Sequence, residues 1–407
     1  MNQNQQILVT LLVKAIRNEN IDKSGIKNAD WENIFLEAKK HEVHTLLYPL
    51  LKNSGIINEL DSELISEWEY SSVLAGVTQL QHVNEISRIL ELFNESNISV
   101  IAVKGLVLRD LYPHPELRIM SDADLLIHKS DLNTAKRILK NLNYSLSNTT
   151  SCHAVFTHEK HLPIELHWAL ASQEHLKTAE IFEADIWNQT TYVEIESTPV
   201  LTLRDEKQLA YLFLHMAVHM LSSGFGLRQL CDLVLFIHSR METINWNAVL
   251  EDIRTLNLER FSLAVLAICD QLFGLTVPSQ FANNSFLNDA NICLFIEDII
   301  SGGIYGKEIP ERKTGSLQLR FSSTGKGHHG KLIFSRSFLF PSAQNLKGKY
   351  VYAQKTPLLV PIAWIHRILD NAFRKDISIA EKKTILFSSS SDVNAKKRME
   401  LLRWLEL

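Results

Sequence analysis

The sequence predicts an α+β fold in which a small mixed sheet is embedded between an N-terminal and a C-terminal helical region. Apolar residues recur at helical spacing over residues 1–97, short β-branched runs alternate with helical segments over 98–200, and helical spacing returns over 201–300. Residues 301–407 combine a glycine-rich stretch with further helical patterns. These changes in periodicity predict four parts, of which the second holds the sheet.

Composition and charge narrow the class of protein. A chain of 407 residues with 45% hydrophobic and 22% charged side chains is typical of a folded protein with two or three domains. The net charge of −4 gives no global reason to bind nucleic acid or an anionic membrane. The N-terminus is not typical of a signal peptide, and no uninterrupted apolar run is long enough to span a membrane. The four cysteines are widely spaced without a CxxC pair, which indicates reduced thiols in a cytoplasmic protein.

Helices account for the N-terminal part. Gln6–Arg17 has apolar residues at helical spacing, and Asp30 is a candidate N-cap for a helix over Trp31–His41. A longer helix is expected within Leu60–Asn97. Its apolar stripe consists of Leu80, Val83, Ile86, Ile89, Leu90 and Phe93. Such a stripe indicates helix packing, not chemistry.

The sheet region opens with a strand that runs into a glycine turn. Ser99–Val103 is β-branched, and Lys104-Gly105 breaks it before a short apolar helix. A glycine at such a turn lets a backbone approach a ligand closely, and the N–H groups of the next helical turn suit a phosphate. The turn therefore predicts a phosphate-binding position.

Two aspartates follow on the next strand. Alternation along this strand sends Asp122 and Asp124 to one face and Ala123, Leu125 and Ile127 to the core. Two carboxylates held side by side repel each other unless a cation lies between them, and Mg²⁺ prefers oxygen ligands of this kind. The spacing predicts a divalent metal site.

A third carboxylate comes from a later strand. Cys152–Thr157 and Leu162–Ala169 are predicted strands joined by a polar turn. In the second strand, apolar residues alternate with a polar face on which Glu165 is the acidic residue and His167 is a structural neighbour. If this strand lies beside the aspartate strand, Glu165 points to the same face as the two aspartates.

These motifs resemble the DNA polymerase beta-type nucleotidyltransferase superfamily, whose signature is a strand, a glycine turn opening a helix, an Asp-x-Asp strand and a third carboxylate. More narrowly, the Lys104-Gly105 turn, Tyr112-Pro113, Arg118 and the Asp-Ala-Asp-Leu-Leu run beginning at Asp122 are similar to the family of uncharacterised nucleotidyltransferases. The turn is Gly105-Leu106 where the superfamily usually has Gly-Ser or Gly-Gly.

The resemblance implies a function and a set of site residues. The reaction would move a nucleoside monophosphate from an NTP to an acceptor with Mg²⁺ or Mn²⁺. The implied catalytic residues and metal ligands are Asp122, Asp124 and Glu165. The implied nucleotide-binding residues are Lys104, Gly105, Arg118 and Ser121. A small molecule, a peptide and a protein are all compatible acceptors, and Lys104 and Arg118 could also be ordinary surface cations.

Two other classes of function stay open from the sequence. The altered Gly105-Leu106 turn favours a catalytically silent nucleotide-binding or interaction protein that keeps the fold. A metal-dependent hydrolase would use His215 and His219, which lie four residues apart on a predicted helix, but the HMAVH segment lacks the glutamate of HExxH. Burial of these histidines, with hydrogen bonds to backbone or to Asp232, is the preferred interpretation.

Three features complete the C-terminal half. Arg228 and Asp232 have the spacing of a helical ion pair, which is the preferred interpretation, although they could instead line the face that opposes the sheet. Residues 301–330 are rich in glycine and predict a loop or linker. Helices are expected over Pro361–Phe373 and in the KKRMELLRWLEL segment that ends the chain.

Overall fold

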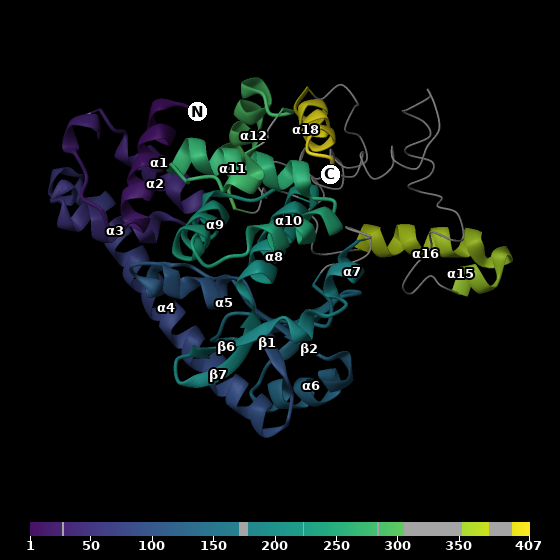
Figure 1. Cartoon of the computed structure of the whole chain (residues 1–407). Coiled ribbons are helices and arrows are strands. Elements are labelled where there is room, and N and C mark those ends of the chain that lie inside the picture. Colours follow the sequence, from purple (N-terminus) through teal and green to yellow (C-terminus); the bar gives the residue numbers. More distant parts are fainter. Residues whose placement is uncertain (27, 171–177, 223, 283–284, 305–351, 374–392) are drawn as a thin grey trace. The chain divides into compact units, whose positions relative to one another are not determined.

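The computed structural model describes residues 1–26, 28–170, 178–222, 224–282, 285–304, 352–373 and 393–407 (Figure 1). Two compact units are present: Met1–Gly306 together with Trp404–Leu407, and Lys307–Arg403. The four-part division of the chain stays a prediction, and most of the 301–330 loop lies outside the described residues. Within the described ranges, no helix is both long and apolar enough to cross a bilayer.

Helices form the N-terminal part, as the periodicity predicts. α1 (Gln3–Ile16), α2 (Trp31–Lys40) and α3 (His44–Asn53) precede the 34-residue α4 (Ser62–Glu95). The predicted cap is confirmed, because Oδ1 of Asp30 accepts a hydrogen bond from the backbone of Asn33 at 3.1 Å.

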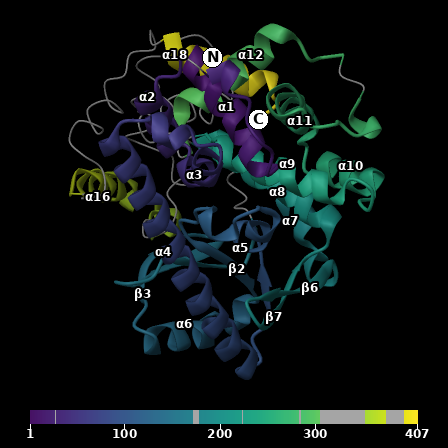
Figure 2. The ribbon, with the colours of Figure 1, turned by 90° about the vertical axis from the view of Figure 1, so that its left-hand side faces the viewer.

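The long helix α4 connects the N-terminal helices to the sheet. Its 34 residues give a length of about 50 Å at 1.5 Å per residue, and it runs from α3 past the sheet towards α6 (Leu132–Asn141) (Figure 2). The predicted stripe is buried except at Leu80, which is 45% exposed. The helix therefore buries this stripe where it passes the sheet, and it buries Trp68 against α3 nearer its N-terminus.

The first unit contains a seven-stranded mixed sheet with strand order β3-β4-β5-β2-β1-β7-β6. Its strands are β1 (Val100–Ala102), β2 (Ala123–Ile127), β3 (Ser145–Thr149), β4 (His153–Thr157), β5 (Ile164–His167), β6 (Thr190–Ile195) and β7 (Thr198–Leu203). β2 pairs antiparallel with β1 and parallel with β5, and β1 pairs parallel with β7. The predicted α+β class with a small mixed sheet is confirmed.

One face of the sheet is apolar. Ala123, Leu125 and Ile127 of β2 join Ile164 and Leu166 of β5 in a buried cluster that also includes side chains of α4 and α6. Because side chains alternate along a strand, the residues between these point to the opposite face. The predicted alternation is therefore confirmed, and it separates the core face from a polar face.

Further helices belong to the first unit, and the first two of those named next lie between strands of the sheet. They are α5 (Gly105–Leu108), inserted after β1, and then α7 (Ala179–Glu183), α8 (Asp205–Ser222), α9 (Leu227–Arg240), α10 (Trp246–Thr255), α11 (Glu259–Phe273) and α12 (Asp289–Gly302). The C-terminal part contains α15 (Tyr352–Lys355), α16 (Val360–Phe373) and α18 (Val393–Trp404). The last two correspond to the helices expected there.

A buried ion pair joins the chain before β2 to helix α9. Nη2 of Arg118 lies 2.5 Å from Oδ2 of Asp232, and the hydroxyl of Tyr112 donates to Oδ1 of Asp232 at 2.8 Å. The predicted ion pair between Arg228 and Asp232 is wrong: Arg228 contacts Glu42 and donates to the Ile119 carbonyl at 2.7 Å. Helical spacing suggested the pair, but tertiary contacts provide both residues with other partners.

We expect Asp232→Ala to lower the free energy of unfolding by about 3–5 kcal/mol, because it leaves the Arg118 guanidinium buried without its carboxylate. Urea unfolding measures the change. The matched control is the double variant Arg118→Met with Asp232→Leu, which removes both charges and should recover much of the loss. A loss below about 1 kcal/mol in Asp232→Ala would contradict a structural role for this pair.

Candidate active site

The parallel pairing of β2 with β5 brings predicted site residues together. Asp124 and Glu165 are direct partners in this pairing, so their side chains leave the sheet on the same face. Asp122 lies just before β2, two residues from Asp124, and its carboxyl is subject to the charges of Asp124 and Glu165. These three residues are called the carboxylate cluster below. The strand adjacency on which their convergence depends is confirmed.

Two cationic or protonatable side chains hold Asp124. Nζ of Lys104 lies 2.7 Å from Oδ1 of Asp124, and Nε2 of His167 lies 2.9 Å from the same oxygen. The Lys104 side chain is only 14% exposed, although the sequence suggested a solvent-accessible cation. A lysine from the end of β1 and a histidine of β5 therefore converge on one carboxylate of β2.

The electrostatics of the cluster are asymmetric. Burial alone would raise the pKa of Asp124, but the Lys104 charge and the His167 hydrogen bond hold it well below its usual range. Burial would likewise lower the pKa of Lys104, yet the Asp124 charge raises it above its usual range. Burial, and then the neighbouring Asp124 charge, raise the pKa of Asp122 to about 7. Asp124 is thus neutralised locally, whereas Asp122 is the carboxylate that a further cation would stabilise most.

The turn after β1 is strained at the lysine. Lys104 has φ 58° and ψ −130°, a region that residues with a side chain rarely adopt and that costs about 1–3 kcal/mol. Its carbonyl accepts hydrogen bonds from Val107 and Leu108 at 3.1 and 3.0 Å, and its ammonium is fixed on Asp124. Strain of this kind is found where the surrounding contacts over-determine a functional position.

The sequence suggested that Gly105 allows a ligand to approach the backbone, but the structure gives another explanation for a glycine at this position. A Cβ at Gly105 would collide with Nη1 of Arg118, so glycine is required by the close approach of a buried guanidinium. Arg118 is 5% exposed, and its contacts are with Asp232 and the Ile119 carbonyl. Ser121 lies half-buried in the bend before β2. Arg118 therefore packs against the turn at Gly105 from the buried side.

Helix α8 supplies residues that the sequence analysis did not assign to the site. Tyr211, His215 and His219 follow one another at intervals of four, and the charges of Lys104 and Asp124 influence the pKa of each. Nε2 of His219 lies 2.9 Å from Nε2 of His215, so the predicted bonds to backbone or Asp232 are replaced by a bond between the two rings. Three polar side chains at helical spacing within an apolar helix were the available signal.

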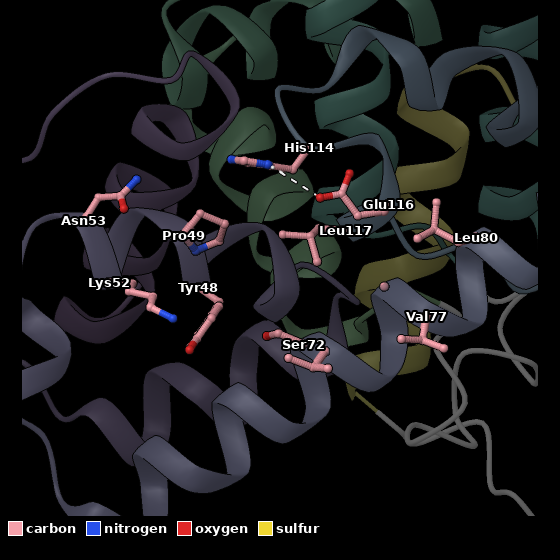
Figure 3. A pocket seen from close by; sticks show the side chains of 12 residues that line it. Tyr48, Pro49, Lys52, Asn53, Ser72, Val77, Leu80, His114, Glu116 and Leu117 are labelled. Carbon is pink, nitrogen blue, oxygen red and sulfur yellow. Dashed lines mark ion pairs between the residues drawn. The ribbon is translucent and has the colours of Figure 1, made fainter.

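A surface hollow elsewhere in the first unit contains none of the predicted site residues. It lies between α3, α4 and the turn around residues 114–117, and the ion pair between Nδ1 of His114 and Oε1 of Glu116, 3.6 Å apart, is at its edge (Figure 3). Exposed Val77 and Leu80 of α4 line it. None of the residues that line this hollow belongs to the carboxylate cluster.

A sequence profile described as uncharacterised nucleotidyltransferase matches residues 27–274, which include every residue of the candidate site. The chain belongs to this family. No curated protein sequence matches the chain.

Two solved structures are similar to part of this nucleotidyltransferase. The antibiotic-resistance factor ANT(2'')-Ia has a TM-score of 0.34 at 14% identity, covering 46% of this chain and 96% of its own. An antigenic nucleotidyltransferase-like protein from Paracoccidioides brasiliensis has a TM-score of 0.32 at 12% identity, covering 50% of this chain and 98% of its own. At these values the two likenesses carry no functional argument, so the family assignment depends on the sequence match.

The carboxylate cluster has donors that suit a divalent cation. Three carboxylates supply hard oxygen ligands of the kind that Mg²⁺ and Mn²⁺ prefer. The Lys104 ammonium already lies at Oδ1 of Asp124, which shows that this position accepts a positive charge. Burial and the neighbouring Asp124 charge raise the pKa of Asp122, and the Lys104 charge offsets them only in part. The residues present therefore fit a metal.

We expect Asp122→Asn to stabilise the metal-free protein above pH 7 by about 2–4 kcal/mol, a benefit that disappears towards pH 4. The sign follows because the folded-state pKa of about 7 exceeds the unfolded value, so the wild type gains stability as the pH falls and Asp122 takes up a proton. Calorimetry in a chelating buffer at pH 8 and pH 5 measures the difference. Asp270→Asn, on the exposed side of α11, is the control, and an equal gain at both pH values would contradict the prediction.

Proposed function

We propose that this protein transfers a nucleoside monophosphate from an NTP to an acceptor in a reaction that depends on Mg²⁺ or Mn²⁺. The observation that carries the proposal is the parallel register of Asp124 with Glu165, which sets two carboxylates side by side with Lys104 at the end of the neighbouring strand. Family membership supports the general reaction class. To this general class we add NTP as the donor, Mg²⁺ or Mn²⁺ as the metal, and the residues named below.

The carboxylate cluster would hold the metal, which when bound offsets the charge of the attacking oxygen and of the departing pyrophosphate. Asp122 and Asp124 would be its ligands, and Glu165 accepts the proton of the acceptor hydroxyl. The acceptor oxygen then forms a bond to the α-phosphorus while the bond from that phosphorus to the bridging oxygen breaks. Pyrophosphate leaves with the bonding electrons.

Lys104 is the residue we assign to the triphosphate, together with the backbone of Gly105 and Ser121. Its ammonium is already balanced by Asp124, so it must turn from that carboxylate to a phosphate when the cluster receives a metal. Arg118 contributes by fixing the turn through its contact with Gly105. The strained Lys104 backbone keeps the ammonium close to the cluster in both states.

A catalytically silent nucleotide-binding protein is the second candidate. One observation favours it: Oδ1 of Asp124 is occupied by both Lys104 and His167. Incubation with each NTP and Mg²⁺ or Mn²⁺, with and without hydroxyl-bearing small molecules, peptides and proteins, distinguishes the two by pyrophosphate release. Nucleotide binding without release under every condition would favour the silent protein.

We expect Asp122→Asn and Asp124→Asn each to reduce pyrophosphate release by at least about 1,000-fold, because an amide keeps the shape of the carboxyl but not the charge that binds the metal. Steady-state rates and circular dichroism of both variants check this. Asp270→Asn, remote from the cluster, should keep the wild-type rate. Wild-type turnover in either cluster variant would refute the site assignment.

We expect Lys104→Ala to weaken NTP binding by about 10–100-fold, because it removes a charged donor from the triphosphate. Isothermal titration at two salt concentrations measures the affinity. Lys140→Ala is the matched control, since Lys140 is an exposed lysine on α6, which covers the other face of the sheet. An unchanged affinity would assign Lys104 to the structural support of Asp124 alone.

A further inference from the structure

Two histidines accompany Glu165 on the polar face of the sheet. His153 of β4 and His167 of β5 are direct cross-strand partners, and their ring centroids lie 5.0 Å apart. One ring nitrogen of each histidine and one carboxylate oxygen of Glu165 all lie within 4.8 Å of one another. These three residues are called the histidine–glutamate cluster below.

The hydrogen bonding of His167 leaves an excess of acceptors. Its Nε2 lies 2.9 Å from Oδ1 of Asp124 and 3.2 Å from Oε2 of Glu165, yet one ring nitrogen carries at most one hydrogen. Among the described residues, Nδ1 of His167 is a buried atom without a hydrogen-bond partner. The ring is therefore surrounded by more lone pairs than its protons satisfy, and a cation would relieve this imbalance.

The ring of His153 is held by contacts of its Nδ1 atom with neighbouring residues. Its Nδ1 lies 3.1 Å from Oγ1 of Thr150 and 3.5 Å from Sγ of Cys152. Histidines that bind metals commonly use the second ring nitrogen for such an outer contact, which fixes the tautomer and points the first nitrogen at the ion. His153 and Glu165 are both partly exposed, so an ion has a route to them.

We propose that the histidine–glutamate cluster of His153, Glu165 and His167 binds a borderline transition-metal ion such as Zn²⁺, at a position distinct from the hard cation on Asp122 and Asp124. Imidazole nitrogens favour Zn²⁺ over Mg²⁺, and two histidines with one carboxylate leave an open fourth position. Tetrahedral ligand atoms at bonds of about 2.1 Å lie about 3.4 Å apart. The atoms of the cluster all lie within 4.8 Å of one another, so any pair needs to approach by at most about 1.4 Å, which side-chain rotation supplies. The site shares Glu165 with the proposed reaction, but its existence does not require nucleotide transfer.

The test uses the full chain, stripped with a chelator and titrated with Zn²⁺ by calorimetry in the presence of excess Mg²⁺. Binding of one Zn²⁺ that His153→Ala weakens by roughly 100-fold, and that Asp122→Asn and the exposed-surface variant His238→Ala leave unchanged, is expected. Co²⁺ in place of Zn²⁺ should give a visible absorption band in the wild type that is absent from His153→Ala. The variant Thr150→Val removes the outer contact of His153 together with the hydrogen bonds that Oγ1 accepts from the backbones of Cys152 and His153. It should weaken Zn²⁺ about 10-fold and serves where His153→Ala does not fold.

Three outcomes overturn the inference: no Zn²⁺ binding in excess Mg²⁺, binding that Asp122→Asn abolishes, or binding that neither His153→Ala nor Thr150→Val changes. Pyrophosphate release measured on the same samples separates this inference from the proposed function. Histidine-dependent Zn²⁺ binding without turnover supports the metal site and removes the proposed activity. Turnover without histidine-dependent Zn²⁺ binding overturns the metal site alone.

Discussion

The buried charge of Asp124 is the constraint on which the polar face of the sheet depends. A carboxylate that is 5% exposed is stable in the folded protein only with compensating partners. Lys104 at the end of β1 and His167 on β5 provide them, so three adjacent strands are joined through one oxygen atom. Because removal of either partner would leave charge unpaired, the order and register of these strands and the position of the site are set together.

The strain at Lys104 is the local consequence of this arrangement. β1 must end next to Asp124, and the chain must then turn into α5 without moving the ammonium away from that carboxylate. The backbone reaches this geometry at φ 58°, and the buried Arg118 guanidinium then fills the space beside Gly105 that a side chain would need. Arg118 is in turn held by Asp232 of α9. A chain of contacts thus transmits the position of α9 to the turn that faces the carboxylate cluster.

Much of the site could be predicted from local patterns, because strand alternation fixes a face without any knowledge of the tertiary structure. Ala123, Leu125 and Ile127 determine where Asp122 and Asp124 point, and the same logic applies to Glu165. The partners of Arg118 and Arg228 could not be predicted, because they lie on elements more than a hundred residues away. The parallel pairing of β7 with β1 could not be predicted for the same reason, because it joins positions about a hundred residues apart in the sequence.

The positions of the histidines can be explained by strand and helix periodicity, so their closeness to charged residues cannot be recognised from the sequence. His167 shares the polar face of β5 with Glu165, and His215 and His219 share a helix face with Tyr211, so each position is explained by periodicity alone. Only the tertiary structure shows that the charges of Lys104 and Asp124 influence the pKa of His167 and of His215, which come from different elements. The charges of Lys104 and Asp124 therefore act on imidazoles as well as on the other carboxylates. The proposed site therefore offers nitrogen ligands next to oxygen ligands, because the sheet register places His153 opposite His167. In the proposed arrangement, this register would decide which metal each group of ligands selects.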